Sequence, residues 1–133
     1  TPAGGRPRLP QALTENKPAV VVIALGANYG LRGLPLAQMR DNLNGMVEAA
    51  RATGAKVLLA GIRLPPNYGP YAIEFHASFS KIASQQKVAL LEFLLAPIAA
   101  RQTYFQADNL HPTAEAQPLI LDHVWPTLLP LLR

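Results

Sequence analysis

The 133-residue sequence contains no cysteine and only three histidines. The absence of cysteine excludes disulfides, thiolate nucleophiles and cysteine-based zinc sites. No two histidines are spaced by four residues, so the sequence predicts no metal site. Any chemistry of this chain is therefore expected from oxygen and nitrogen groups.

Clusters of positive charge are missing as well. There are 12 lysines and arginines against 8 acidic residues, a formal net charge of +4, and only Arg6 and Arg8 lie close together. A nucleic-acid surface needs clustered cations with interleaved aromatic side chains, so no nucleic-acid partner is predicted. No apolar run is long enough to cross a bilayer. Because the sequence starts at Thr1 rather than methionine, we expect a piece of a longer product, and the lack of a visible secretory signal says little about compartment.

What the sequence does contain is apolar stretches with a regular spacing. Half of the residues are hydrophobic, and this length suits one domain with one core, covering 1–133. Continuous apolar runs at 19–25, 55–62 and 88–93 predict strands that are covered on both faces, as in a parallel sheet.

Helical periodicity separates these strands. It predicts helices at 34–54 and 71–86, with Gly54 ending the first, whereas residues 1–13 begin loose and become weakly helical. The residues expected on the inner faces of the two helices are Leu36, Met39, Leu43, Met46, Val47 and Ala50, followed by Ala72, Phe75, Phe79 and Ile82. Strands alternating with helices predict an α/β sandwich with a parallel sheet and right-handed crossovers.

A last helix is expected after Thr113. The Thr113 side chain is predicted to cap it, and Glu115 in its first turn complements the helix dipole. Pro126 and Pro130 should bend or fray this helix, and Trp125 is expected to fill the core or the space beside it.

Three loops follow the predicted strands and should meet at one edge of the sheet. They are "GANYGLRG" at 26–33, "RLPPNYGP" at 63–70 and "ADNLHP" at 107–112. In parallel α/β folds the active site lies at the carboxyl ends of the strands, so this edge is the expected site.

The loop "DNLHP" carries an acid and an imidazole three residues apart. Asp108 can accept a hydrogen bond from one ring nitrogen of His111 and leave the other nitrogen free as a base. Asn28, at the end of the first strand, has amide protons that can stabilise a negatively charged oxygen. A base, an orienting acid and an oxyanion donor together indicate acyl transfer to a serine nucleophile.

At these residues the sequence resembles the SGNH (GDSL-type) hydrolases. "GANYGLRG" resembles their third block, G-x-N-D, and "DNLHP" resembles their fifth, D-x-x-H-P. "IRLPPNYG" is similar to the intervening loop of one bacterial branch, the multifunctional acyl-CoA thioesterases, lysophospholipases and arylesterases, which are often periplasmic. The resemblance runs from about Gly4 to the C-terminus. It implies a flavodoxin-like, three-layer α/β/α fold, a periplasmic or secreted location and a small acyl ester or thioester substrate, with no cofactor or metal.

The resemblance also implies roles for individual residues. Asn28 becomes the side-chain oxyanion donor, and Gly26 the close-approach residue of its turn. His111 becomes the general base and Asp108 its orienting carboxylate. The loop 63–71 would border the acyl-binding groove, which makes its candidate substrate-binding residues Pro66, Asn67, Tyr68 and Tyr71.

Two features depart from the family pattern. Tyr29 stands where the family normally has aspartate, so the usual bracing of that turn does not carry over. The family's first block, which holds the nucleophilic serine, and its second block, which supplies an oxyanion glycine, would both precede Thr1. We therefore expect the chain itself to lack its nucleophile and to be inert. The serines of the sequence, which are Ser78, Ser80 and Ser84, fall in a predicted helix, and a nucleophile needs a strained, exposed turn.

Loss of the family's first strand has a structural consequence. In flavodoxin-type sheets that strand is central and pairs beside the third. Without it, the strand at 19–25 would present an apolar edge that invites self-association.

Several less specific interpretations remain open. Taken alone, Asn28 is a common turn residue, His111 an ordinary residue beside a helix, and Asp108 a loop cap. Tyr68 and Tyr71 could pack the loop rather than line a groove. For the whole protein, the alternatives are a non-catalytic binding or self-association module and a carbohydrate acetylesterase of the same fold.

Overall fold

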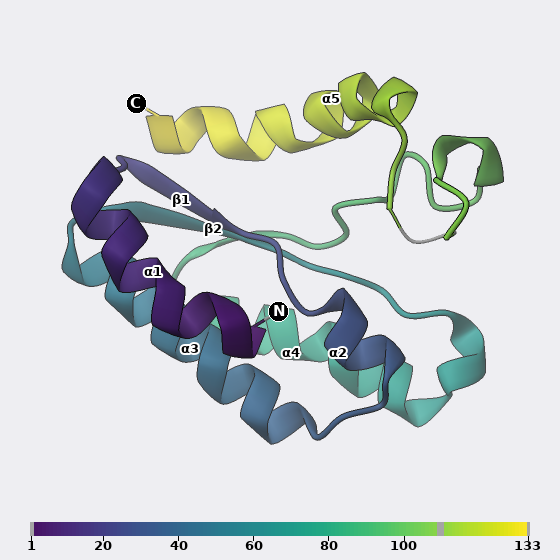
Figure 1. Ribbon diagram of the computed structural model, residues 1–133, viewed down its shortest axis with the longest axis horizontal. Helices are drawn as coiled ribbons and strands as arrows, with labels where there is room; N and C mark the ends of the chain where they lie inside the picture. Colours follow the sequence, from purple (N-terminus) through teal and green to yellow (C-terminus); the bar gives the residue numbers. More distant parts are fainter. Residues whose placement is uncertain (1, 109–110, 133) are drawn as a thin grey trace.

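In the computed structural model, the described residues are 2–108 and 111–132, and the side chains of Pro2 and Asn28 lie outside the description. A parallel sheet in the order β1-β2-β3 forms the middle of the structure (Figure 1). Its strands are β1 (Val20–Ile23), β2 (Lys56–Ala60) and β3 (Ala89–Leu91). Each lies inside a predicted apolar run, and the parallel pairing is confirmed.

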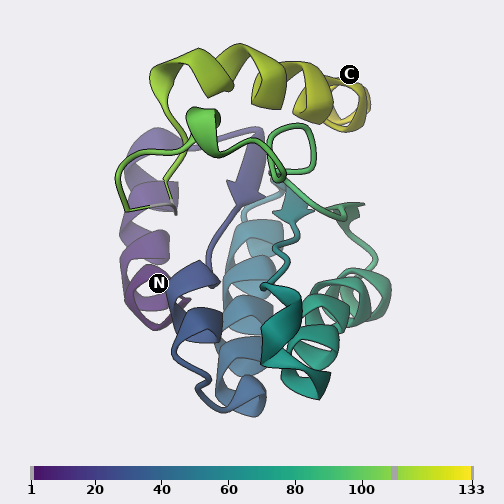
Figure 2. The ribbon, with the colours of Figure 1, turned by 90° about the vertical axis from the view of Figure 1, so that its right-hand side faces the viewer.

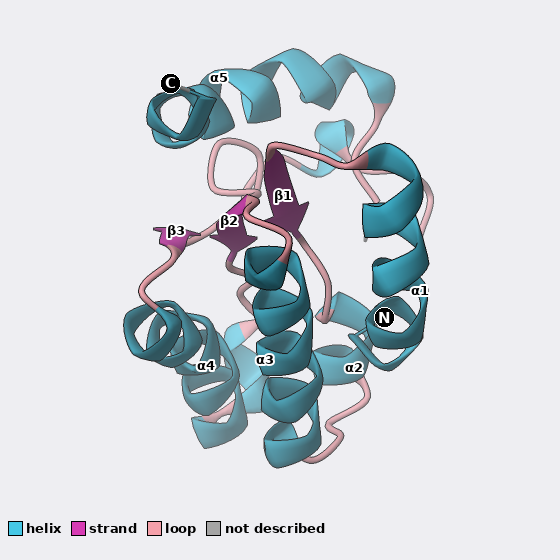
Figure 3. Ribbon diagram, turned by 90° about the vertical axis from the view of Figure 1, so that its left-hand side faces the viewer, coloured by secondary structure: helices cyan, strands magenta, loops and turns pink. Residues whose placement is uncertain are grey.

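Helices cover both faces of this sheet (Figure 3). The helices α3 (Leu36–Ala52) and α4 (Pro70–Gln86) lie on one face, and α5 (Gln117–Leu128) lies on the other. The N-terminal helix α1 (Pro2–Asn16) packs against α3. The arrangement is the predicted α/β/α sandwich. No helix of the described residues is both long and apolar enough to cross a membrane.

The main core lies between the sheet and the α3–α4 layer. All six residues expected on the inner face of α3 are buried. Phe75, Phe79 and Ile82 of α4 are also buried, and Ala72 is partly buried against the same cluster. Gly54 adopts a φ of 85° just after α3, which is the left-handed ending that glycine favours.

The first helix is longer than its sequence indicates. It is helical from Pro2, so Pro7 and Pro10 lie inside it instead of at a loose start. Proline removes an amide donor, but packing against α3 compensates. Leu13 is buried there, and the Arg6 guanidinium lies 3.0 Å from the Asp41 carboxylate. Tertiary packing here outweighs local propensity.

The C-terminal segment corrects two expectations. Thr113 makes no capping bond, because a short 3₁₀ turn (Ala114–Ala116) precedes α5 and the Thr113 hydroxyl is buried without a partner among the described residues. Trp125 is not in the core, since it is 44% exposed. Pro126 lies within α5, and the chain passes into a 3₁₀ turn at Leu129–Leu132 that contains Pro130. The two prolines were expected to bend or fray this helix. The structure shows instead that the helix passes into the tighter 3₁₀ form at its C-terminal end.

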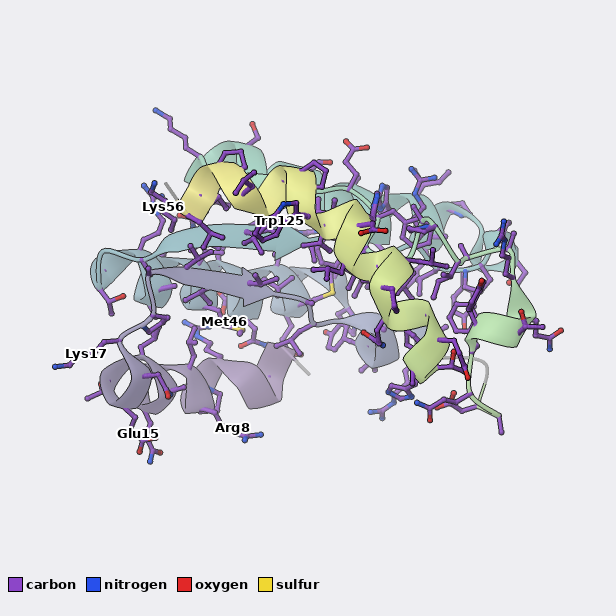
Figure 4. All side chains as sticks on the ribbon, turned by 90° about the horizontal axis from the view of Figure 1, so that it is seen from above. Arg8, Glu15, Lys17, Met46, Lys56 and Trp125 are labelled. Atoms are coloured by element: carbon purple, nitrogen blue, oxygen red, sulfur yellow. The ribbon has the colours of Figure 1, made fainter. Side chains whose placement is uncertain are left out.

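One edge of the sheet is formed by β1. Among the described residues β1 pairs only with β2, so its other side faces α1 without a neighbouring strand (Figure 4). The prediction that this strand is covered on both faces is only half right. Ile23 is buried in the core cluster with residues of α3 and α4, whereas Val22, the preceding residue, is 47% exposed.

Candidate active site

The connections that follow the strands lie at the same end of the molecule (Figures 1 and 2). After β1 the chain forms the short helix α2 (Ala27–Leu31), and after β2 it forms a 3₁₀ turn (Pro66–Tyr68). The segment after β3 reaches the Asp108–His111 loop at this end. "GANYGLRG" was predicted as a glycine-rich turn, and the structure shows one turn of helix in it.

A small antiparallel pairing holds the loop that contains Asp108 and His111. Phe105 and Pro112 form an isolated bridge. On either side of it, the Gln106 amide donates to the carbonyl of His111 at 2.8 Å, and the Thr113 amide donates to that of Tyr104 at 2.8 Å. The spacing of side chains does not indicate this pairing, because it is made by main-chain groups that are present at every residue.

The Asp108 carboxylate makes two hydrogen bonds to His111. Its Oδ2 lies 2.5 Å from Nδ1 of the ring, and its Oδ1 accepts the main-chain amide of His111 at 3.0 Å. The second bond fixes the backbone, so the first can fix the orientation of the ring. With Nδ1 donating to the carboxylate, Nε2 is left as the acceptor, which is the tautomer a general base needs. The side chains of His111 and Asp108 are 63% and 46% exposed.

Gly26 begins the turn after β1 in a conformation that favours glycine. Its φ is 126°, and it is buried under the side chains of α3 and α4. Its carbonyl accepts the amide of Gly30 at 2.9 Å, which closes α2. The backbone of Asn28 is part of α2, but the Asn28 side chain lies outside the described residues. The predicted oxyanion amide and its distance from His111 therefore stay predictions.

Tyr29, the departure from the family pattern, is buried and bonds within its own loop. Its hydroxyl donates to the carbonyl of Pro35. The hydroxyl of Tyr68 donates to the carbonyl of Leu31 at 2.8 Å, and that of Tyr71 donates to the carbonyl of Leu34 at 2.5 Å. These bonds fit the loop-packing interpretation of both tyrosines.

The pKa of the Tyr71 hydroxyl is perturbed. Burial raises this pKa above 10.0, and the nearby Tyr29 adds to the increase.

Pro66 and Asn67, the other predicted substrate-binding residues, are exposed in the 3₁₀ turn after β2.

The serines lie in α4, as predicted. Ser78 is buried and donates to the carbonyl of Glu74 at 2.9 Å, a bond within its own helix. Ser80 and Ser84 are exposed on the same helix.

The remaining histidines each contact a carbonyl after a strand. Nδ1 of His76 lies 3.2 Å from the oxygen of Ile62, and Nε2 of His123 lies 2.8 Å from that of Phe93.

Two surface hollows lie away from these residues, along α1. One, of about 450 Å³, is lined by both α1 and α3 residues, including Leu13 and Ala49. The other, of about 440 Å³, includes Leu9 and Met46. Neither is lined by a predicted site residue, and we place the site by the chemistry at the strand ends. No group of three or more acidic or histidine side chains among the described residues could hold a metal ion.

Residues 1–118 match the model of the GDSL-like Lipase/Acylhydrolase family. The chain belongs to this family. The family match includes the glycine-rich turn, the loop after β2 and the Asp108–His111 pair, so the resemblance seen in the sequence is confirmed.

Relatives within the family support the assignment. The chain is 55% identical to "Esterase TesA" of Pseudomonas aeruginosa. The alignment covers 99% of this chain and 66% of that protein. It is 41% identical to "Arylesterase" of Vibrio mimicus and 37% identical to "Thioesterase 1/protease 1/lysophospholipase L1" of Escherichia coli, and it covers 62% of each. The alignments extend over 93% and 97% of this chain. The chain thus spans less than two thirds of the length of these family members.

Solved structures of the family agree with the fold. The crystal structure of TesA matches with a TM-score of 0.93 at 54% identity, covering 98% of this chain and 73% of that one. A psychrotrophic esterase, EstA from Pseudoalteromonas sp., in a structure inhibited by monoethylphosphonate, matches with a TM-score of 0.91 at 39% identity. It covers 99% of this chain and 73% of that one.

Proposed function

We propose that the protein carrying this sequence hydrolyses carboxylic esters or thioesters by a Ser-His-Asp mechanism. The observation that supports the proposal most is the contact between Asp108 and His111, 2.5 Å between carboxylate and ring nitrogen at the strand ends. An imidazole held in this way is ready to accept a proton through Nε2.

In the proposed reaction, a serine hydroxyl attacks the carbonyl carbon and His111 takes its proton. Asp108 keeps the ring oriented and stabilises the imidazolium that forms. The Asn28 side chain, with backbone amides near Gly26, stabilises the oxygen of the tetrahedral intermediate. One such donor is worth about 3 to 4 kcal/mol in comparable sites. His111 then protonates the leaving group, which departs and leaves an acyl-serine ester. Water attacks the carbonyl of this ester, His111 takes a proton from the water and returns it to the serine oxygen, and the carboxylic acid is released.

The nucleophilic serine is proposed to come from residues outside the 133. Ser78, Ser80 and Ser84 lie within α4, away from any strained turn. The relatives are about half as long again as this chain, which covers 66% and 62% of them. We infer that 1–133 is the C-terminal portion of a single hydrolase domain, inert without its nucleophile.

The substrate is proposed to be a small acyl ester or thioester. The names of the relatives, esterase, arylesterase and thioesterase/lysophospholipase, support this class. Pro66 and Asn67 are exposed beside the predicted site, where they could border an acyl chain. A periplasmic or secreted location is part of the same proposal and rests on the family resemblance. Cell fractionation of the source organism would test it.

The test uses the protein that carries this sequence together with its upstream residues, assayed on p-nitrophenyl acyl esters. His111→Ala should lower kcat by about 10⁴-fold or more, because the general base is removed. Asp108→Asn should lower kcat by a comparable factor, because the carboxylate no longer keeps the proton of the His111 ring on Nδ1. Asp122→Asn, an exposed acid in α5, is the matched control and should keep full activity. Activity that survives His111→Ala would contradict the proposed base. Comparing an acyl thioester with an acetylated sugar separates the thioesterase from the carbohydrate esterase of the same fold.

A second candidate is a non-catalytic module that self-associates through β1. The unpaired side of β1 among the described residues and the exposed Val22 favour it. If the upstream-extended protein turns over no ester and forms dimers in light scattering, this candidate replaces the hydrolase.

A further inference from the structure

The segment between α2 and α3 has an open tip, although Leu31 and Leu34 on either side of it pack against the core. Arg32 and Gly33 at its tip are exposed, and a Cβ placed on Gly33 would meet nothing within 4 Å. Gly33 adopts a φ of 65°, a turn conformation that glycine favours. The tip of this turn therefore has little side-chain packing of its own to fix its position.

Tyrosine hydroxyls hold this segment. Three carbonyls of its main chain, those of Leu31, Leu34 and Pro35, each accept one phenolic hydroxyl. Two of the donors, Tyr68 and Tyr71, come from the loop after β2 and the start of α4. The third, Tyr29, comes from α2 itself. The connections after β1 and after β2 are thereby tied together.

The rings that carry these hydroxyls are anchored in the core. Tyr29 is buried, and Tyr68 and Tyr71 pack against the same cluster of residues. The Tyr71 ring stacks on that of Phe75 at 6.4 Å between centroids. Because the rings are fixed by packing, each hydroxyl is directed at its carbonyl without the loss of much side-chain freedom.

The helix that these bonds support carries Asn28. Its backbone lies one residue before Tyr29 in α2, and a donor to an oxyanion must be held within a fraction of an ångström of its working position. We propose that Tyr29, Tyr68 and Tyr71 are positioning residues, which hold α2 so that Asn28 meets the oxyanion. This inference rests on the proposed hydrolase function, and it assigns Tyr68 and Tyr71 a role other than substrate binding.

Burial raises the pKa of Tyr71 above its usual value, so its hydroxyl remains a hydrogen-bond donor throughout the neutral range.

The experiment removes the hydroxyls and keeps the rings. Tyr68→Phe, Tyr71→Phe and the double variant are made in the upstream-extended protein, with Tyr104→Phe as the matched control. The Tyr104 hydroxyl makes no hydrogen bond to the described residues, and its ring lies against Arg101. On a p-nitrophenyl ester, the double variant should lose about 10-fold or more in kcat with KM unchanged, since a misplaced catalytic group costs rate and leaves ground-state binding alone.

A second measurement does not depend on catalysis. Hydrogen–deuterium exchange of the amides in 30–34 should become about 2- to 10-fold faster for each hydroxyl removed. Exchange in α3, which supplies none of the three carbonyl acceptors, should not change. The loss of thermal stability in each variant should stay within a few degrees of that in Tyr104→Phe.

The outcomes separate the possibilities. A raised KM with kcat intact, or an altered preference for acyl-chain length, would make the tyrosines substrate-binding residues and overturn the inference. Unchanged exchange would show that the hydroxyls do not hold the segment, and faster exchange with unchanged kcat would show that holding it does not position the donor. If the wild-type protein has no turnover, the proposed function fails and the positioning role fails with it. The exchange data still decide whether the tyrosine hydroxyls hold the segment between α2 and α3.

Discussion

Replacing Gly30 by alanine should destabilise the protein, because α2 packs on α4 through this glycine. A Cβ at Gly30 would lie 2.5, 2.8 and 2.9 Å from three ring carbons of Phe75. The Phe75 ring is fully buried and is packed edge-on against Phe79 at 5.5 Å between centroids. It therefore has no room to move away from the new methyl group.

The expected magnitude combines two opposing effects. Overpacking a filled core costs about 1 to 3 kcal/mol, and three contacts this short belong in the upper half of that range. Alanine gains up to about 1 kcal/mol over glycine in a helix, and less in a helix of one turn. We expect Gly30→Ala to lower the free energy of unfolding by about 1 to 2 kcal/mol.

Gly45→Ala is the matched control in α3. The added Cβ would lie 2.5 Å from Nε of Arg6, but that side chain is flexible and can move aside. It would then lose its pair with Asp41, which is exposed and worth little. Gly45→Ala should therefore be neutral or stabilising by up to about 1 kcal/mol.

Urea unfolding followed by circular dichroism measures both variants. Combining Gly30→Ala with Phe75→Leu should cost less than the sum of the two single changes, because leucine leaves space for the methyl group. Additive costs, or a Gly30→Ala variant as stable as Gly45→Ala, would refute the close packing of α2 on Phe75.

Two further predictions concern hydroxyl groups. Thr113→Val should be neutral or stabilising by up to about 1 kcal/mol in urea unfolding, because the buried Thr113 hydroxyl has no partner among the described residues; a loss above that size would indicate a partner. In an absorbance titration, Tyr71 should ionise above pH 10.0, the usual value for tyrosine. Since its pKa is raised by folding, its contribution to stability is complete below about pH 10 and is lost as the pH rises through the folded value. Tyr71→Phe should remove that part of the alkaline loss of stability, and an unchanged pH profile in this variant would contradict the shift.

Much of the fold was predictable because apolar periodicity reports burial directly. The inner face of α3 was identified residue by residue, and each of the three strands lies inside a predicted apolar run, with bounds narrower than predicted. Phe75, Phe79 and Ile82 of α4 followed from the same spacing of three and four residues. The predictions failed where packing overrides local preference. Proline made α1 look loose at its start, yet α3 holds it helical from Pro2.

The candidate site divides in the same way. Asp108 and His111 are close in the chain, so their contact was predictable from a spacing of three, and the structure confirms that contact. The family could also be identified from short motifs that keep their order. What the sequence could not give were partners distant in the chain whose acceptors are main-chain carbonyls. Tyr68 bonds to Leu31 and Tyr71 to Leu34, each across 37 residues, and a carbonyl is present at every position.

The sequence by itself therefore determined the order of the three strands and of α3 and α4 between them, the buried faces of those two helices and the chemistry available at the strand ends, because these depend on side-chain type and local spacing. Only the tertiary structure decided which carbonyls accept the hydroxyls of Tyr29, Tyr68 and Tyr71, that Trp125 lies outside the core and how close α2 lies to Phe75. Those features depend on which surfaces meet after the chain has folded, and no local pattern of residues encodes them.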